Sequence, residues 1–203
     1  MLQSISYGTQ RVYPSKIVCI GRNYVEHIHE LNNEIPESMV VFNKPNSAVS
    51  DQLRYFTPQT RFEGEICFLV EKGEISGIGL GLDLTHADIQ QYLKSKGLPW
   101  ERAKSFDGSA VLSRFVPFQG KMESLEMRLF KNGTLVQHAS YDLMIYKPNV
   151  MLEEIKRFMS LEDGDVIMSG TPKGVGNFTK GDCFEGEIRS GGDIILSTRF
   201  DVI

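Results

Sequence analysis

The chain has 203 residues, of which 41% are hydrophobic and 24% charged, and this composition excludes a disordered, collagen-like or coiled-coil protein. The net charge is −4, from 22 Lys and Arg against 26 Asp and Glu, and no basic run is present to neutralise the phosphates of a nucleic acid. The longest apolar run, Ile66 to Val70, is far short of the roughly 20 residues that span a bilayer. We therefore predict a cytoplasmic protein without nucleic-acid or membrane partners. It should form one domain over residues 1–203, with 1–15 as a short N-terminal extension.

Short alternating apolar segments outnumber helical ones, so the chain is expected to be rich in strands. Asn132 and Gly133 lie between two such segments and supply the positive φ angles that a type I′ hairpin turn requires. Gly-Asp pairs predict three turns that each lead into a strand, at 164–165, 181–182 and 192–193. The expected strands cover residues 16–20, 38–42, 65–70, 125–130, 135–138, 165–168 and 193–197.

Three helices are expected among these strands, which gives an α+β fold. The first follows Asn23, the second begins at Thr85 and ends near Gly97, and the third covers residues 149–160. The cysteines are widely spaced, form no C-x-x-C pair and are expected to be reduced core residues (Cys19, Cys67 and Cys183).

Three carboxylates are candidates for a metal site. Glu63 and Glu65 stand at i and i+2 at the start of an apolar strand, so their side chains should share one face. Asp83 lies just ahead of an expected helix. Carboxylates without a nearby Cys or His favour a hard cation such as Mg²⁺ or Mn²⁺ over zinc, and the alternative is ordinary surface carboxylates on an edge strand. An Asp83→Ala variant is expected to lose metal-dependent activity and to remain folded.

His27 and Glu30 stand at i and i+3 on the first expected helix. At this spacing a carboxylate can orient a neutral imidazole, which can then take a proton from water. The alternative is a solvated surface pair. His86 is close to Asp83 in sequence but is expected to be exposed, and His138 is expected to be structural or exposed.

A glycine-rich loop at residues 169–176 could turn its backbone N–H groups toward an anion, although it lacks the Walker A spacing. Glycines at 77, 79 and 81 miss the dinucleotide fingerprint, because Leu82 stands where the third glycine is needed. Lys104 lies among aromatic residues. A partly buried lysine there could pair with an anionic substrate or titrate near neutrality, but the sequence alone favours a lysine that extends along the surface.

From about residue 16 to the end, the chain contains a series of short segments that resemble motifs of the fumarylacetoacetate hydrolase family and occur in the same order as in that family. The short chain is most similar to the compact members that act on oxaloacetate and acylpyruvates. The segments are Gly21-Arg22-Asn23-Tyr24 with His27 and Glu30, Lys44-Pro45, Glu63-Gly64-Glu65, Leu82-Asp83-Leu84-Thr85, Asp88-Ile89-Gln90, Gly97-Leu98-Pro99-Trp100, Lys104-Ser105-Phe106-Asp107, Gly164-Asp165, and Gly170 to Gly176.

This resemblance implies a mixed β-sandwich roll of the family's C-terminal-domain type, usually a homodimer. It implies that Mg²⁺, or Mn²⁺, is held by three carboxylates and that a lid dyad orders when substrate binds. Two positions depart from the family pattern: Phe62 where relatives often have histidine, and Ala87 where they often have arginine. The implied residues are Glu63, Glu65 and Asp83 for the metal, His27, Glu30 and Lys104 for catalysis, and Arg22, Gln90 and Thr171 for substrate binding.

The resemblance further implies a metal-dependent enzyme that stabilises the enolate of a small 2-oxo or 1,3-dicarbonyl acid. The leading hypothesis is an oxaloacetate keto–enol tautomerase, which requires only proton transfer. Alternatives are hydrolysis of an acylpyruvate such as fumarylpyruvate or acetylpyruvate, oxaloacetate decarboxylation and, from another class, a non-catalytic dicarboxylate-binding protein. The sequence leaves open whether Lys104 or His27 moves the proton.

Overall fold

The computed structural model describes residues 2–30 and 36–203, with the His29 side chain left out. Its largest sheet is mixed and has the strand order β4-β3-β14-β7-β8-β10-β5, with β11 paired to β8. Most residues of the central hairpin of β7 and β8 are buried, which explains their apolar sequences. The strands are β3 (Lys16–Gly21), β4 (Val40–Pro45), β5 (Val49–Ser50), β7 (Gly64–Glu71), β8 (Glu74–Asp83), β10 (Ala110–Leu112), β11 (Val116–Pro117) and β14 (Val166–Met168).

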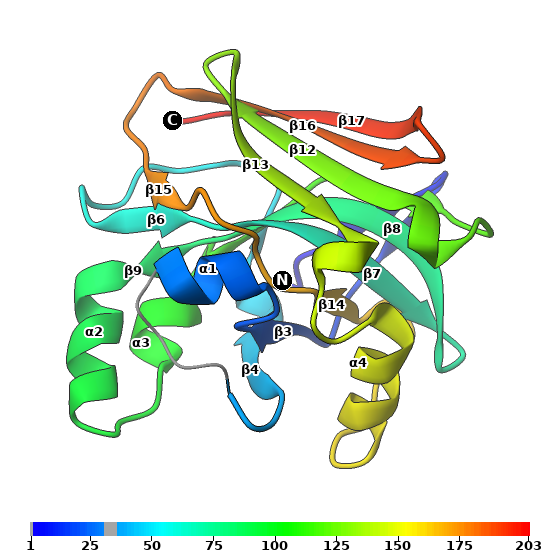
Figure 1. Ribbon diagram of the computed structural model, residues 1–203, viewed down its shortest axis with the longest axis horizontal. Helices are drawn as coiled ribbons and strands as arrows, with labels where there is room; N and C mark the ends of the chain where they lie inside the picture. Colours follow the sequence, from blue (N-terminus) through cyan, green and yellow to red (C-terminus); the bar gives the residue numbers. More distant parts are fainter. Residues whose placement is uncertain (1, 31–35) are drawn as a thin grey trace.

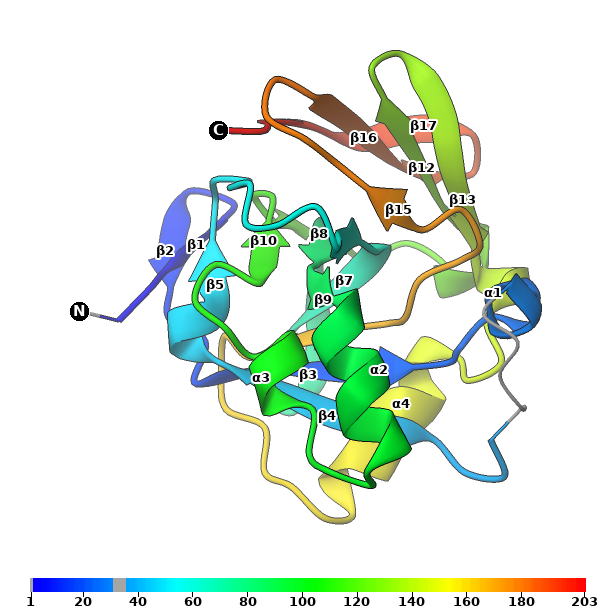
Figure 2. The same cartoon turned by 90° about the vertical axis from the view of Figure 1, so that its left-hand side faces the viewer.

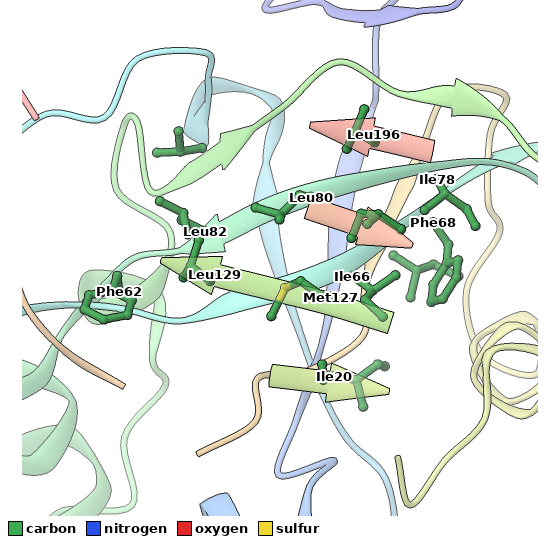
Figure 3. Close-up of a cluster of buried hydrophobic side chains, with 14 of the residues drawn as sticks. Ile20, Phe62, Ile66, Phe68, Ile78, Leu80, Leu82, Met127, Leu129 and Leu196 are labelled. Atoms are coloured by element: carbon green, nitrogen blue, oxygen red, sulfur yellow. The ribbon is translucent and has the colours of Figure 1, made fainter. Parts of the chain in front are cut away.

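A second, antiparallel sheet with the order β13-β12-β16-β17 packs over β7 and β8 (Figure 1). Alternate residues of β7 and β8, such as Ile66, Phe68 and Leu80, meet Met127 and Leu129 of β12 in the main hydrophobic core (Figure 3). Full burial stabilises the fold by roughly 1.5–3 kcal/mol for each such side chain. The strands are β12 (Leu125–Lys131), β13 (Thr134–Ser140), β16 (Cys183–Ser190) and β17 (Asp193–Asp201).

The opposite face of the large sheet buries a smaller cluster that includes Cys19 and Cys67. Both cysteines are free and buried, as predicted, whereas Cys183 is free but only partly buried. The glycines of β8 make room on this face, because a Cβ at Gly79 would come within 2.9 Å of the Phe115 ring. The glycines at 77, 79 and 81 therefore serve strand packing.

The helices and short strands surround this sandwich. The helices α2 and α3 lie on one side of the molecule and α4 on the other (Figure 1), and α2 and α3 face the viewer in Figure 2. The helices are α1 (Val25–Glu30), α2 (Ala87–Ser95), α3 (Glu101–Lys104) and α4 (Pro148–Lys156), with 3₁₀ turns at Asn46–Ala48, Met122–Ser124 and Tyr141–Leu143. The short strands are β1 (Ile5–Tyr7), β2 (Gln10–Val12), β6 (Thr60–Phe62), β9 (Thr85–His86) and β15 (Gly176–Asn177).

The strand-rich α+β fold and most of the local predictions are confirmed. Asn132 and Gly133 have φ angles of 51° and 78° between β12 and β13, as a type I′ turn requires. The predicted start of the second helix at Thr85 is wrong. Thr85 pairs with Arg61 in a short sheet, so the helix begins two residues later at Ala87.

No helix in the described part of the chain is long and apolar enough to cross a membrane. The assignment of residues 1–203 to one domain with a 1–15 extension stays a prediction. Within that extension, β1 and β2 form a hairpin that is joined to the body by a hydrogen bond from Gly8 N–H to the Phe115 carbonyl.

Candidate functional site

The hairpin of β7 and β8 brings the candidate carboxylates together. Because the two strands are antiparallel, the start of β7 lies beside the end of β8, and Asp83 N–H donates to the Glu63 carbonyl at 2.8 Å. The side chains of Glu63, Glu65 and Asp83 place oxygens within 4.8 Å of one another. The predicted shared face of Glu63 and Glu65 is therefore present, with Asp83 beside it.

Lys104, at the end of α3, lies against this cluster. Its ammonium donates to Glu63 Oε2 and Asp83 Oδ2 at 2.8 Å each and to Thr85 Oγ1 at 2.6 Å. Only 3% of the residue is exposed, so the prediction of a surface lysine is wrong. Burial alone would lower the pKa of Lys104, but the charges of Asp83 and Glu63 raise it well above its usual value.

A second buried lysine, Lys44, contacts the other carboxylate oxygen of Asp83. Lys44, in β4, is fully buried, and its Nζ lies 2.8 Å from Asp83 Oδ1. It also donates to Ser109 Oγ at 3.1 Å and to the backbone carbonyl of Lys104. Sequence reasoning gave Lys44 no role, because only the fold brings its side chain to Asp83, 39 positions later in the chain.

The charge of Glu65 is less well compensated than the charges of its neighbours. Its pKa is raised well above the usual value by burial and by the negative charges of Asp83 and Glu63, although Gly170 N–H donates to its Oε2 at 2.7 Å. Burial would also raise the pKa of Glu63, but Lys104 and Thr85 lower it. A hard divalent cation would relieve the repulsion at Glu65, and an all-carboxylate donor set suits such an ion.

His27 and Glu30 form a contact on α1. The carboxylate Oε2 of Glu30 accepts a hydrogen bond from Nδ1 of His27 at 3.1 Å, which leaves Nε2 with the lone pair of a base. Glu30 Oε1 also accepts from Gly174 N–H at 3.0 Å. A side chain at Gly174 would place its Cβ 2.0 Å from the Val136 carbonyl, so this position requires glycine.

Backbone N–H groups of the glycine-rich loop do face anionic groups, and these are two carboxylates of the protein itself. Gly170 N–H donates a hydrogen bond to Glu65, and Gly174 N–H donates one to Glu30. One loop thus holds both a candidate metal ligand and the candidate dyad.

These groups open onto one cavity. Its lining also contains Arg22, at the end of β3, and Gln90, on α2. Arg22 adopts a φ of 57°, a conformation that is uncommon for a residue with a side chain. All predicted site residues except Glu30 therefore line this cavity. Glu30 lies outside the lining but contacts His27. The cavity lining includes Arg22, His27, Glu63, Glu65, Asp83, Gln90, Lys94, Trp100, Lys104 and Thr171.

The residue Gln137, on β13, connects the two sheets at this site and was not found from the sequence. Its side chain accepts from Gly64 N–H at 2.8 Å and donates to Thr171 Oγ1 at 2.8 Å. Thr171 in turn donates to the Gly64 carbonyl at 2.9 Å. A glutamine in an alternating strand carries no distinguishing signal, because its partners are far away in sequence.

The two departures from the family pattern lie outside the carboxylate cluster. Phe62 packs in the core, with its ring centroid 4.7 Å from that of Phe184, and Ala87 begins α2. His86 is partly buried rather than exposed, and its ring stacks on Phe106 with a centroid distance of 3.9 Å. Burial lowers its pKa. His138, which was predicted to be structural or exposed, is exposed.

The chain matches known proteins over nearly its whole length. The fumarylacetoacetate (FAA) hydrolase C-terminal family model matches residues 16–198. Oxaloacetate tautomerase YcgM of Escherichia coli is 36% identical, with 84% of this chain and 87% of that protein covered. The mitochondrial oxaloacetate tautomerase FAHD1 of Bos taurus is 34% identical, with 92% of this chain and 90% of that protein covered.

Solved structures agree with this similarity. A putative fumarylacetoacetate isomerase/hydrolase from Oleispira antarctica superposes with a TM-score of 0.94 at 36% identity and full coverage of both chains. Fumarylpyruvate hydrolase from Pseudomonas aeruginosa, in complex with Mn²⁺ and pyruvate, superposes with a TM-score of 0.87 at 26% identity, over 100% of this chain and 97% of that chain.

Proposed function

The chain belongs to the fumarylacetoacetate hydrolase family and is an enzyme of that family, and from this premise we propose that it is a metal-dependent oxaloacetate keto–enol tautomerase. The observation that carries the proposal is the cluster of Glu63, Glu65 and Asp83 in the wall of a cavity that also contains His27 and Lys104. Relatives named oxaloacetate tautomerase, at 34–36% identity, support the choice of substrate. We further propose that Arg22, Gln90 and Thr171 bind the substrate.

The proposed metal is Mg²⁺, with Mn²⁺ as the alternative, held by the carboxylates of Glu63, Glu65 and Asp83. The surroundings of Glu65 support this assignment, because burial and then the negative charges of Asp83 and Glu63 raise its pKa, and a bound cation would offset both effects. The P. aeruginosa fumarylpyruvate hydrolase structure contains Mn²⁺. When bound, such an ion supplies positive charge that stabilises an enolate oxygen.

We assign the proton transfer to Nε2 of His27. Glu30 accepts from Nδ1 at 3.1 Å, so the neutral ring presents a basic Nε2 in the cavity wall. Lys104 is a weaker candidate for the base, because Asp83 and Glu63 raise its pKa and keep its proton in place. Its ammonium instead contributes fixed positive charge beside the reacting oxygen.

Enol-oxaloacetate tests the tautomerase directly. Metal-stripped protein, with and without Mg²⁺, is added to freshly dissolved enol, and the enol absorbance and pyruvate are followed in one sample. The expected result is Mg²⁺-dependent loss of the enol without pyruvate. Prompt pyruvate would indicate decarboxylation instead, and an unchanged enol decay would reject the tautomerase.

Acylpyruvate hydrolysis is the second candidate, and the contact between His27 and Glu30 favours it, since an oriented imidazole can activate water. The similarity to fumarylpyruvate hydrolase adds support. If this reaction occurs, His27→Ala should abolish pyruvate release from fumarylpyruvate or acetylpyruvate. His138→Ala, at an exposed histidine outside the cavity lining, should leave the rate unchanged. Equal rates in both variants would remove His27 as the base.

We also propose that the protein is a cytoplasmic homodimer, on the basis of the family resemblance. Light scattering on the purified protein should give twice the chain mass of 22.9 kDa. A value equal to one chain would reject the dimer.

A further inference from the structure

Lys94 is a cavity residue to which the mechanism above assigns no role. It lies on α2, four residues after Gln90, so both side chains project from the same face of the helix. Both line the cavity that contains the carboxylate cluster. Figure 2 shows α2 running along the side of the molecule that faces the viewer.

The ammonium of Lys94 lies over an aromatic ring, with Nζ 5.2 Å from the centroid of Trp100. This contact positions the side chain without neutralising it. Within residues 2–30 and 36–203, no carboxylate forms a salt bridge with Lys94. Partial burial lowers its pKa, and the positive charges of Arg22 and Lys104 lower it further. A partly desolvated cation near two other cations is a favourable place for an anion.

The two other lysines near the carboxylate cluster are paired. Lys104 forms salt bridges with Glu63 and Asp83, and Lys44 forms one with the other oxygen of Asp83. Lys94, over the Trp100 ring and without a salt bridge among the described residues, is therefore the cavity lysine placed to receive an anion. If the carboxylate cluster held the proposed metal ion, a small dicarboxylate bound to that ion by one end would need another cation for its other end.

We propose that Lys94 binds the second carboxylate of the substrate and so selects dicarboxylic over monocarboxylic 2-oxo acids. This assignment deepens the proposed function and rests on it. The charge-assisted hydrogen bond forms in both ground and transition states, so it contributes to affinity more than to the chemical step.

Binding of two non-reacting acids tests the assignment without relying on turnover. Malate carries the second carboxylate, whereas oxalate is too short to reach beyond the first end. Titration calorimetry with Mg²⁺-loaded protein compares both acids in wild type, Lys94→Met and Lys94→Arg. Lys96→Met, at an exposed lysine of the same helix terminus that does not line the cavity, is the matched control.

We expect Lys94→Met to weaken malate binding by about ten- to hundredfold and oxalate binding by less than about twofold. Lys94→Arg should retain malate affinity within about threefold, and Lys96→Met should match wild type. In enol turnover, Lys94→Met should raise KM for oxaloacetate and leave kcat nearly unchanged.

The assignment would be overturned if Lys94→Met kept its malate affinity, or if its affinities for malate and oxalate fell equally. It would also be overturned if the wild-type protein bound oxalate but not malate. Failure of the wild type to convert the enol would reject the tautomerase proposal separately, because the comparison of malate with oxalate does not depend on turnover.

Discussion

At the scale of single residues, the site is a balance of buried charges. Two lysines approach Asp83 from opposite oxygens, with Nζ distances of 2.8 Å each, and Glu65 is left with a raised pKa. Charges inside a protein are tolerated when they are paired, and removal of one partner leaves the other exposed to the full desolvation penalty. Each member of the cluster therefore affects stability as well as chemistry.

The structure changes the prediction for Asp83→Ala. The sequence suggests a folded, inactive variant, but Asp83 is 1% exposed and its removal would leave Lys44 and Lys104 with less compensation. We now expect a loss of about 3–5 kcal/mol in the free energy of unfolding, measured by urea denaturation. Asp107→Ala, at an exposed aspartate, is the control. A loss below about 1 kcal/mol would contradict this account.

At the scale of elements, the site depends on connections between segments that are distant in the chain. Asp165, directly before β14, accepts from Ser15 and Lys16 backbone N–H groups at 2.8 and 3.1 Å, and Lys16 Nζ lies 2.6 Å from its Oδ2. The parallel pairing of β14 with β3 starts from this point. The strand β14 in turn leads into the glycine-rich loop that serves Glu65 and Glu30.

The carboxylate of Asp165 should make stability depend on pH. Burial alone would raise its pKa, but hydrogen bonds from Lys16, Glu162 and Ser15 outweigh burial and lower it. A lowered folded pKa means that the stabilisation is complete above the unfolded value of about 4 and is lost as pH falls through the folded value.

Asp165→Asn should therefore lower the free energy of unfolding by about 1.5–3 kcal/mol at pH 7. Urea denaturation of wild type and variant from pH 7 down to pH 3 should show the difference shrinking below about pH 4. A difference that is constant over this range would show that Asp165 does not act through its charge.

At the scale of the whole molecule, two packed sheets hold the carboxylates close together. The hairpin of β7 and β8 contributes to the core between the sheets and carries Glu65 and Asp83 at one end. Burial of apolar side chains along this hairpin stabilises the fold and offsets the repulsion among the carboxylates. An ion that binds only the folded protein should therefore add stability.

Addition of Mg²⁺ should raise the melting temperature of the metal-stripped protein. At a concentration of 100 times Kd the gain is about 2.7 kcal/mol. Glu65→Gln is expected to fold nearly as well without metal, because the amide removes a buried charge that Asp83 and Glu63 repel, but it should lose most of the Mg²⁺ response. Differential scanning calorimetry with and without Mg²⁺ measures both effects. A full response in Glu65→Gln would exclude Glu65 as a ligand.

The sequence by itself determined what depends on neighbours in the chain. Alternating apolar residues identified the main strands, Asn132-Gly133 identified the hairpin turn, and the order of short motifs identified the family. Thr85 was misassigned, since a capping residue and a strand residue look alike when the β6 partner is unknown. Only the tertiary structure showed the buried state of Lys104, the roles of Lys44 and Gln137, and the position of Lys94. The roles of Lys44 and Gln137 depend on contacts between residues tens of positions apart, and the shared cavity of Lys94 and Lys104 joins residues from distant segments, which local backbone preferences do not encode.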